Sequence, residues 1–315
     1  MPQQGGAGDP ARPGLRPGGG SPPSGRQERE LWLPAHAVPE LPEVETLAAD
    51  LRPQVVGRTV TGCEVRFPTI VRHPAPERFT AELVGRRIEA VTRRGKYVLH
   101  HLEGGLGEGV LLVVHLGMTG QWRCVKPDAP EPDHLHAVLV LDDGCQLRYR
   151  DVRRFGRLLL GSEPELVAAR KLPRLGPEPL DPDFTAARLY RRLHARRAPL
   201  KALLLDQMVV AGVGNIYADE SCFRAGVRPD RPANSLSRRA VSRIHSALST
   251  LLREAIANRG SSVDSYRDAW GEMGREQELL QVYGRGGEPC LRCGRPLSVV
   301  RLAGRTTVFC RRCQR

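Results

Sequence analysis

PELPEVET, at residues 39–46, is the stretch around which the rest of the chain is organised. Proline suits the first turn of a helix and carboxylates favour a helix N-terminus, so the stretch predicts a helix start. Apolar residues then recur at helical spacing over residues 43–55, and Gly57 follows as a stop signal. At the true start of a chain, Pro39 and Glu40 would also form a reactive unit, because a secondary amine would stand beside a carboxylic acid.

Residues 1–38 precede this unit and are rich in Gly, Pro, Ser and Arg. They lack hydrophobic periodicity and cannot bury enough surface to offset the entropy of ordering, so we predict a short disordered extension. They also lack the apolar core of a secretory signal. Valine codons can serve as bacterial start codons, so translation from Val38 and removal of the initiator methionine would leave Pro39 at the N-terminus. If Pro39 instead stays in an amide bond, it has no free amine.

The composition indicates a basic globular protein with a polyanionic partner. The 315 residues have 40% hydrophobic content, a formal charge of +13 and a pI of about 9.9. Nucleic acid is the first candidate for such a partner, and a basic surface kept for solubility is the alternative. No apolar run approaches the length of a membrane span. The sequence has no internal repeat or heptad pattern, which favours a monomer.

Short β-like segments follow the first helix. They alternate or run apolar between Gly, Pro and Asp, and Asp143-Gly144 is a plausible hairpin turn. They predict an antiparallel β-sandwich or barrel. The segments are Val60–Phe67, Arg87–Arg93, Tyr97–Leu102, Val110–Leu116, Ala137–Leu141, Gln146–Tyr149 and Leu158–Leu160.

The second half of the chain has a different character. A proline-rich stretch around 172–183 predicts a linker, and Asn215 with its neighbouring glycines predicts a tight turn between two helices. Residues 260–282 contain few apolar side chains and are interpreted as a loop. The predicted helices are Thr185–Ala195, Pro199–Asp206, Ile216–Ala225 and Ser237–Arg259.

Four cysteines near the C-terminus have metal-binding spacing. Sixteen residues separate two Cys-x2-Cys pairs, which is typical of a structural zinc ribbon with four thiolate ligands. Two redox-active pairs are the alternative. The other four cysteines are scattered singly, as reduced thiols are in a cytoplasmic protein. A turn at residues 303–305 would project Arg305 from a hairpin. The predicted ligands of one structural Zn²⁺ are Cys290, Cys293, Cys310 and Cys313.

Eight motifs in order resemble those of bacterial formamidopyrimidine-DNA glycosylase, a bifunctional enzyme that removes 8-oxoguanine from DNA. The resemblance covers residues 39–315. It implies an α+β multidomain fold with a β-sandwich, a helical helix–two-turns–helix domain and a C-terminal zinc ribbon. The motifs are PELPEVET (39–46), RGKY (94–97), HLGMTG (115–120), DVRRFG (151–156), LGPEPL (175–180), GVGNIY (212–217), VYGR (282–285) and the zinc ribbon ending at Gln314.

Domain boundaries follow from these patterns and from the resemblance. The predicted parts are an extension at 1–38, a catalytic β-sandwich domain with its N-terminal helix at 39–165, a linker at 166–183, a DNA-binding helix–two-turns–helix domain with a lesion loop at 184–282, and a zinc finger at 283–315.

The resemblance implies four catalytic residues. Pro39 matches the N-terminal proline whose amine attacks C1′ of the damaged nucleotide, and Glu40 matches the acid that protonates the sugar oxygen. Lys96 matches a lysine that binds the lesion phosphates and assists proton transfer, and Arg305 matches an arginine of the δ-elimination step. From the residues alone, Glu40 could equally be a helix-start carboxylate and Lys96 a solvated loop lysine.

Further residues match DNA contacts of the family. His134, Arg196 and Asn215 match contacts to the DNA, although His-Leu-His and an arginine stand where many relatives have His-Asp-His and a lysine. Asn215 begins a helix, where free backbone N–H groups can hold a phosphate.

Three residues match the side chains that fill the gap left when a base is flipped out of the duplex. Met118 and Phe155 would be wedges, and Arg153 would contact the DNA and hydrogen-bond the orphaned base. Ordinary core packing is the alternative for Met118 and Phe155. Residues 261–276 match the loop that lies over the flipped lesion in the family. Their amino-acid sequence differs from the one that is commoner in that loop.

The sequence thus predicts a DNA glycosylase and AP lyase of base excision repair, acting on double-stranded DNA with oxidised purines through a proline Schiff base and β,δ-elimination. An endonuclease VIII-type enzyme for oxidised pyrimidines is one alternative. A non-catalytic damaged-DNA-binding protein is the other, if Pro39 is not N-terminal. A cytoplasmic, nucleoid-associated monomer without membrane contact is expected.

Overall fold

The structure, a computed structural model, describes residues 38–103, 109–263 and 265–315. The predicted extension therefore lies outside the described residues, except for Val38. Within the described ranges, no helix combines the length and the apolar character needed to span a membrane.

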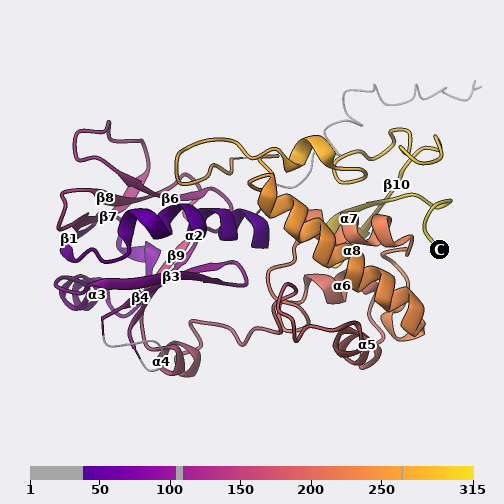
Figure 1. The fold of residues 1–315 in the computed structure, drawn as a ribbon, viewed down its shortest axis with the longest axis horizontal. Coiled ribbons are helices and arrows are strands. Elements are labelled where there is room, and N and C mark those ends of the chain that lie inside the picture. The colour runs from indigo at the N-terminus through magenta and orange to yellow at the C-terminus, as the bar shows by residue number, and fades with distance from the viewer. Residues whose placement is uncertain (1–37, 104–108, 264) are drawn as a thin grey trace, which may run out of the picture. The chain divides into compact units, whose positions relative to one another are not determined.

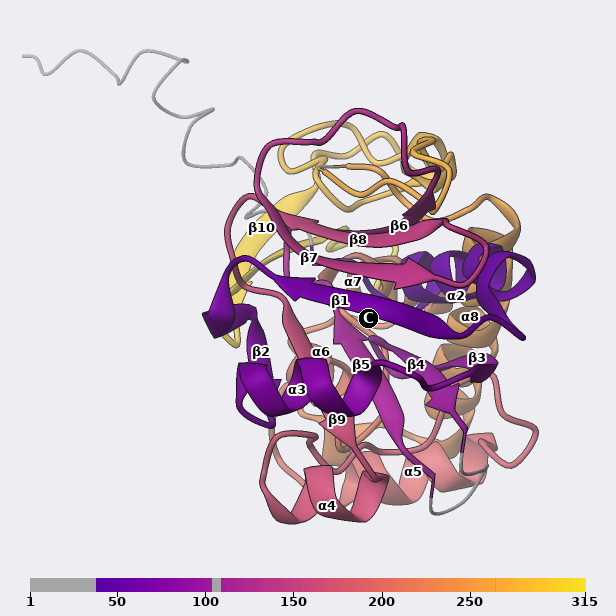
Figure 2. The same cartoon turned by 90° about the vertical axis from the view of Figure 1, so that its left-hand side faces the viewer.

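Two β-sheets form the first part of the chain (Figure 2). One has the order β1-β7-β8-β6 and the other β2-β9-β5-β4-β3. All pairs are antiparallel except β2 with β9, so the predicted sandwich is confirmed with one parallel pair. The strands are β1 Val60–Val65, β2 Val71–His73, β3 Ile88–Arg94, β4 Tyr97–Leu102, β5 Leu111–His115, β6 Gly120–Val125, β7 Leu135–Leu141, β8 Gln146–Asp151 and β9 Arg157–Gly161.

Helix α2 (Leu41–Val55) begins where the sequence predicts. Glu40 is its N-cap, and the carboxylate of Glu43 accepts the Glu40 N–H at 2.8 Å, which completes a capping box. The helix is buried along most of its length and packs against β3, β4 and β6 as well as the later helix α8 (Arg238–Ala257), as Figure 1 shows. The helix start at residue 40 is thus held between the sandwich and the helical part.

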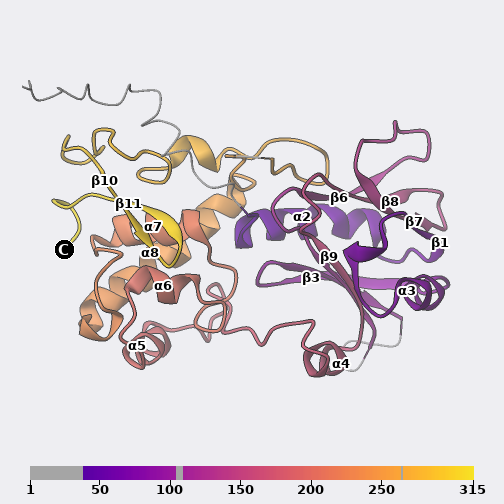
Figure 3. The same ribbon diagram turned by 180° about the vertical axis from the view of Figure 1, so that it is seen from behind.

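The helical part has its own apolar core, built mainly by α5, α6, α7 and α8. Helix α7 ends at Gly226, whose φ of 66° makes the left-handed C-cap that glycine favours. The hairpin of β10 (Ser298–Leu302) and β11 (Arg305–Phe309) packs against α7 (Figure 3). The remaining helices are α3 Pro76–Leu83, α4 Glu163–Ala168, α5 Ala186–His194, α6 Leu200–Leu205 and α7 Asn215–Ala225, with short 3-10 turns at Pro68–Ile70, Ala233–Ser235 and Glu276–Leu279.

Several elements differ from the sequence prediction. Helices α3 and α4 and strands β2 and β6 were not predicted, since each has few apolar side chains in a regular repeat. Helix α4 runs into the first residues of the predicted linker at 166. The turn predicted at 303–305 has only two residues, Ala303 and Gly304, with φ of 47° and 72°, because Arg305 already pairs with Leu302 in the hairpin.

Candidate active site and nucleic-acid interface

A pocket of about 450 Å³ brings together residues from the sandwich, the helical part and the C-terminal hairpin. Four of the residues predicted from the sequence line it, namely Glu40, Lys96, Asn215 and Arg305, together with Val38. They come from the start of α2, the β3–β4 turn, the N-terminus of α7 and the start of β11. The pocket therefore unites groups that are far apart in the sequence.

Glu40 is buried at the N-terminus of α7. Its carboxylate accepts the N–H groups of Gly214 at 2.7 Å, Ile216 at 2.9 Å and Tyr217 at 3.4 Å. These are the N–H groups that a helix leaves without partners in its own first turn. Burial nevertheless raises the pKa of Glu40 to about 7, against the opposing effects of Lys96 and of these backbone donors. Near neutral pH this carboxyl group can both hold and release a proton.

Lys96 stands in the two-residue turn between β3 and β4, where it is half-buried. Burial lowers its pKa, while the charges of Glu40 and Glu43 oppose that shift. The turn is fixed by Glu178, which accepts the N–H of Gly95 at 2.7 Å and pairs with Arg94 at 2.7 Å. The amino group of Lys96 is thus fixed in position near Glu40.

Pro39 is buried immediately before α2, and Val38 lines the pocket. In the full sequence its nitrogen forms the peptide bond with Val38. The position is next to Glu40, so an amine freed at this nitrogen would lie one residue from a carboxyl group that is protonated in part at neutral pH.

Arg305 reaches the pocket because the zinc hairpin is fastened to the helical part. The buried ammonium of Lys201 pairs with Asp219 at 2.7 Å and donates to the carbonyl of Thr306 at 2.9 Å. The second Asp219 oxygen accepts the N–H of Val308 at 3.1 Å. A buried ion pair between α6 and α7 therefore fixes the strand that begins at Arg305.

The four predicted zinc ligands come together at the base of this hairpin. Their sulfur atoms all lie within 4.8 Å of one another, with Cys290 and Cys313 at 3.9 Å and Cys293 and Cys310 at 3.5 Å. Zn–S bonds of about 2.3 Å in a tetrahedron place sulfurs about 3.8 Å apart. The four thiolates therefore fit one structural Zn²⁺, and they leave no position open for chemistry.

The three predicted gap-filling residues lie on two adjacent loops. Phe155 is 50% exposed, which does not fit core packing, and the guanidinium of Arg153 lies 4.9 Å from the centre of its ring. Met118 is half-buried on the neighbouring loop, where the Thr119 hydroxyl accepts the N–H of Arg153 at 3.0 Å. A Cβ at Gly117 would meet the Gly156 nitrogen at 2.6 Å, so the two loops touch through a glycine.

Of the remaining predicted DNA contacts, Asn215 lines the pocket, whereas His134 and Arg196 do not. His134 is exposed in a left-handed turn with φ of 61°, and its carbonyl accepts the N–H of Asp151, next to the loop of Arg153. Arg196 follows α5 and is paired with Asp206, which itself lines the pocket. Asn215 is the first residue of α7 and lines the pocket directly.

Sequence reasoning missed the residues that position these groups. Glu43 accepts the hydroxyl of Tyr217 at 2.6 Å and the N–H of Ser261 at 2.7 Å, besides the N–H of Glu40. Glu178 likewise fixes the turn that carries Lys96. The Lys201–Asp219 pair fixes the strand that begins at Arg305. A second glutamate in the first helical turn was a visible signal for Glu43, but no local pattern marks Lys201 or Asp219 as buried.

Comparisons with known protein families agree with this arrangement. The formamidopyrimidine-DNA glycosylase N-terminal domain matches residues 38–158, and the H2TH domain of the same enzymes matches residues 175–267. The zinc finger found in FPG and IleRS matches residues 287–315.

Curated relatives and solved structures match over most of the chain. The formamidopyrimidine-DNA glycosylase of Moorella thermoacetica is 50% identical over 264 residues, covering 84% of this chain and 95% of its own, and that of Geobacillus kaustophilus is 44% identical over 279 residues, covering 88% and 100%.

Among solved structures, the MutM (FPG) protein of Thermus thermophilus has a TM-score of 0.78 at 46% identity, covering 88% of this chain and 98% of its own. A Lactococcus lactis FPG mutant in complex with Fapy-dG-containing DNA has a TM-score of 0.80 at 35% identity, covering 88% and 100%. The chain therefore belongs to the formamidopyrimidine-DNA glycosylase family.

Proposed function

We propose that this member of the family excises oxidised purines, 8-oxoguanine and formamidopyrimidines, from double-stranded DNA and then cleaves the strand at the resulting abasic site. The main observation is the pocket that Glu40 and Lys96, both with shifted pKa values, line together with Asn215 and Arg305. Glu40 is next in sequence to Pro39. Groups with perturbed proton affinity in one pocket are typical of catalytic sites.

The chemistry begins at the nitrogen of Pro39 and requires Pro39 to be the mature N-terminus. The family match begins at residue 38, which supports this start. An α-amine has a pKa of about 8, so part of it is neutral at pH 7 and can attack C1′. The N–C1′ bond forms, the glycosidic bond breaks and the base departs with a proton. The opened sugar and the secondary amine then form a cationic iminium.

Glu40 supplies the proton for ring opening by protonating the sugar oxygen. The iminium draws electrons from the sugar, so loss of a C2′ proton expels the 3′ phosphate and loss of a C4′ proton expels the 5′ phosphate. Lys96 is placed to bind the lesion phosphates and to move protons, and Arg305 to hold the phosphate that leaves in the second elimination.

The DNA is held by a basic surface and by the two loops beside the sandwich. His134, Arg196 and Asn215 contact the strand, and Met118, Arg153 and Phe155 occupy the gap left by the everted nucleotide. The zinc ion keeps the hairpin of Arg305 in shape. We also propose that the protein acts as a monomer in the bacterial cytoplasm, where its DNA substrate associates it with the nucleoid.

The proposal is tested by incubating the protein that begins at Pro39 with two labelled duplexes, one with 8-oxoguanine opposite cytosine and one with thymine glycol. We expect preferred cleavage of the 8-oxoguanine strand, with phosphates left on both ends of the gap. Preferred cleavage of the thymine glycol strand would instead favour an endonuclease VIII-type enzyme. Binding without cleavage of either duplex would favour a damaged-DNA-binding protein.

A further inference from the structure

The segment between α8 and the 3-10 turn at Glu276–Leu279 is a loop with closed ends. The N–H of Arg275 donates to the carbonyl of Asn258 at 2.8 Å, and the N–H of Glu276 donates to that of Gly260 at 3.0 Å. A Cβ at Gly274 would lie 2.0 Å from the Gly260 carbonyl oxygen, so the two ends pack backbone against backbone. The two ends of the loop, at residues 258–260 and 274–276, therefore lie side by side.

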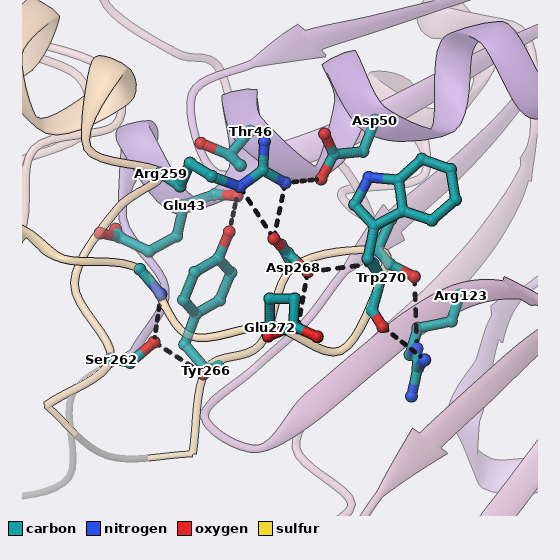
Figure 4. Close-up of polar contacts among 12 residues, drawn as sticks. Glu43, Thr46, Asp50, Arg123, Arg259, Ser262, Tyr266, Asp268, Trp270 and Glu272 are labelled. Carbon is teal, nitrogen blue, oxygen red and sulfur yellow. Dashed lines mark hydrogen bonds and ion pairs between the residues drawn. The ribbon is translucent and has the colours of Figure 1, made fainter.

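Arg259 ties this loop to α2 (Figure 4). Its guanidinium contacts Asp50 of α2 at 2.5 Å and Asp268 of the loop at 2.6 Å, and its Nε donates to Asp268 at 2.9 Å. The side chain of Asp268 is only 1% exposed and that of Asp50 10%, against 42% for Arg259. One arginine thus neutralises two carboxylates from different parts of the chain.

Asp268 also shapes the loop from within. Its other oxygen accepts the N–H groups of Trp270 at 3.0 Å and Glu272 at 2.8 Å. The guanidinium of Arg123 in β6 donates to the carbonyl of Trp270 at 2.9 Å and to that of Ala269 at 3.3 Å. The turn at 268–272 is therefore fastened to α2 on one side and to β6 on the other.

The same loop contacts the candidate site at two points. The N–H of Ser261 donates to Glu43, the glutamate that also accepts the N–H of Glu40, and the hydroxyl of Tyr266 donates to the Glu43 carbonyl at 3.1 Å. The hydroxyl of Ser265 donates to the carbonyl of Met118 at 3.3 Å. The loop thus lies between the Pro39–Glu40 start of α2 and the gap-filling residue Met118.

We propose that Arg259 is a positioning residue for base excision, because it holds the loop at 265–272 against α2 and β6 in the place where that loop meets the everted oxidised base. This rests on the proposed glycosylase function. The base is attached to C1′, the atom that Pro39 attacks, so the loop fixed to Glu43 is next to it. At an abasic site no base remains, so the contacts of Arg259 with Asp50 and Asp268 are needed for excision and not for strand cleavage.

A purely structural role would give a different result. Loss of Arg259 leaves the buried carboxylate of Asp268 without its cation, so Arg259→Gln also lowers the stability of the protein, and a loss of general stability would slow excision and abasic-site cleavage together. The ratio of the two rates therefore distinguishes positioning from stabilisation.

The test uses Asp50→Asn, Arg259→Gln and the double variant, in the form of the protein that begins at Pro39. Single-turnover excision of 8-oxoguanine should fall by about tenfold or more in each single variant, in line with the large cost of misplacing groups near a reacting centre. Cleavage of a preformed abasic site should be unchanged. The double variant should be no slower than the slower single variant, because Asp50 acts through Arg259.

Arg78→Gln is the control for the loss of an ion-paired arginine as such, since it breaks the more exposed pair with Glu82 inside α3, a helix that does not contact Arg259, Asp50 or Asp268 through this pair. It should change neither rate. Unchanged excision in both Asp50→Asn and Arg259→Gln, or an equal fall of the two rates, would overturn the proposal.

Hydrogen–deuterium exchange tests, independently of catalysis, whether Arg259 holds the loop at 265–272 in place. The amides of Trp270 and Glu272 should exchange faster in Arg259→Gln than in the wild-type protein, while those of β7 should not change. Equal exchange would overturn the proposal. If the wild-type protein excised no base, the proposed function would fail, and the exchange result would still show whether Arg259 holds the loop.

Discussion

At the scale of single residues, the site depends on a carboxyl group that is buried yet surrounded by donors. Glu40 accepts the free N–H groups of α7, and it lines the same pocket as Lys96. Desolvation outweighs both influences and raises the pKa of Glu40 to about 7. The same side chain can therefore cap a helix and give up a proton.

Glu40→Gln is expected to slow excision of 8-oxoguanine by about 10²–10⁴-fold, because the amide cannot supply the proton for ring opening. Schiff-base formation at a preformed abasic site should be affected much less, since an abasic sugar is a hemiacetal whose ring opens in water without the enzyme. Rates of both reactions under single turnover, with circular dichroism as a control for folding, check this.

The pH dependence of excision follows from the same group. Because the pKa of Glu40 in the folded protein lies above its ordinary value, the protonated form persists up to about pH 7 and is lost as the pH rises further. The neutral fraction of the Pro39 amine, with a pKa of about 8, rises over the same range. Excision by the wild-type protein should therefore be highest between about pH 7 and 8 and decline above that range, and this decline should be absent in Glu40→Gln. An identical alkaline limb in both proteins would contradict the role of Glu40.

Gly214→Ala tests the close packing of the site. A Cβ there would lie 2.4 Å from Glu40 Cδ and 2.5 Å from Lys96 Nζ, while the backbone at this position is ordinary extended chain. We expect a loss of stability of about 1–3 kcal/mol from overpacking and a much larger loss of excision, because both pocket groups must move. Thermal unfolding and single-turnover rates measure the two effects. Gly62→Ala, where the added atom would meet only Val140 at 3.6 Å, is the control.

At the scale of elements, the sequence predicted most of what depends on local chemistry. The helix that starts after Glu40, the glycine-rich turn before α7 and the cysteine spacing of the ribbon are all confirmed. Elements whose existence depends on partners were missed, such as β6, which is defined by pairing with β8. Short segments of this kind have no period of their own and form only when the sheet is assembled.

The same limit applies to the site. Glu40, Lys96, Asn215 and Arg305 were named from motifs, and the structure places them around one pocket. The groups that position them, such as Glu178 and Lys201, could not be identified, because burial and long-range pairing decide their roles.

Asp219→Asn tests how the zinc hairpin is held. Removal of one partner leaves the buried ammonium of Lys201 uncompensated, which typically costs about 3–5 kcal/mol. For a protein of this size, the melting temperature should fall by roughly 10 °C. Strand cleavage should fall further, because Arg305 loses its support.

Replacing both partners, as Lys201→Met with Asp219→Val, should recover part of the stability since no charge remains buried. A melting temperature of Asp219→Asn equal to that of the wild-type protein would show that the pair does not fix the hairpin.

At the scale of the whole molecule, the described chain unites groups from a β-sandwich, a helical part and a zinc hairpin around one pocket. Each part supplies at least one residue, so none of them alone forms the site. The net charge of +13 gives the long-range attraction to DNA, which increases the encounter rate and depends on salt. Salt dependence alone cannot tell a glycosylase from a binding protein, because both neutralise phosphates.

Borohydride trapping on an 8-oxoguanine duplex is the most direct test of the central claim, that the nitrogen of Pro39 is the nucleophile. Two forms of the protein are compared, one that begins at Pro39 after methionine removal and one with all 315 residues. We expect a covalent protein–DNA adduct with the form that begins at Pro39 and none with the longer form, whose proline nitrogen is an amide. Equal adducts from both forms, or an adduct from neither, would contradict the claim.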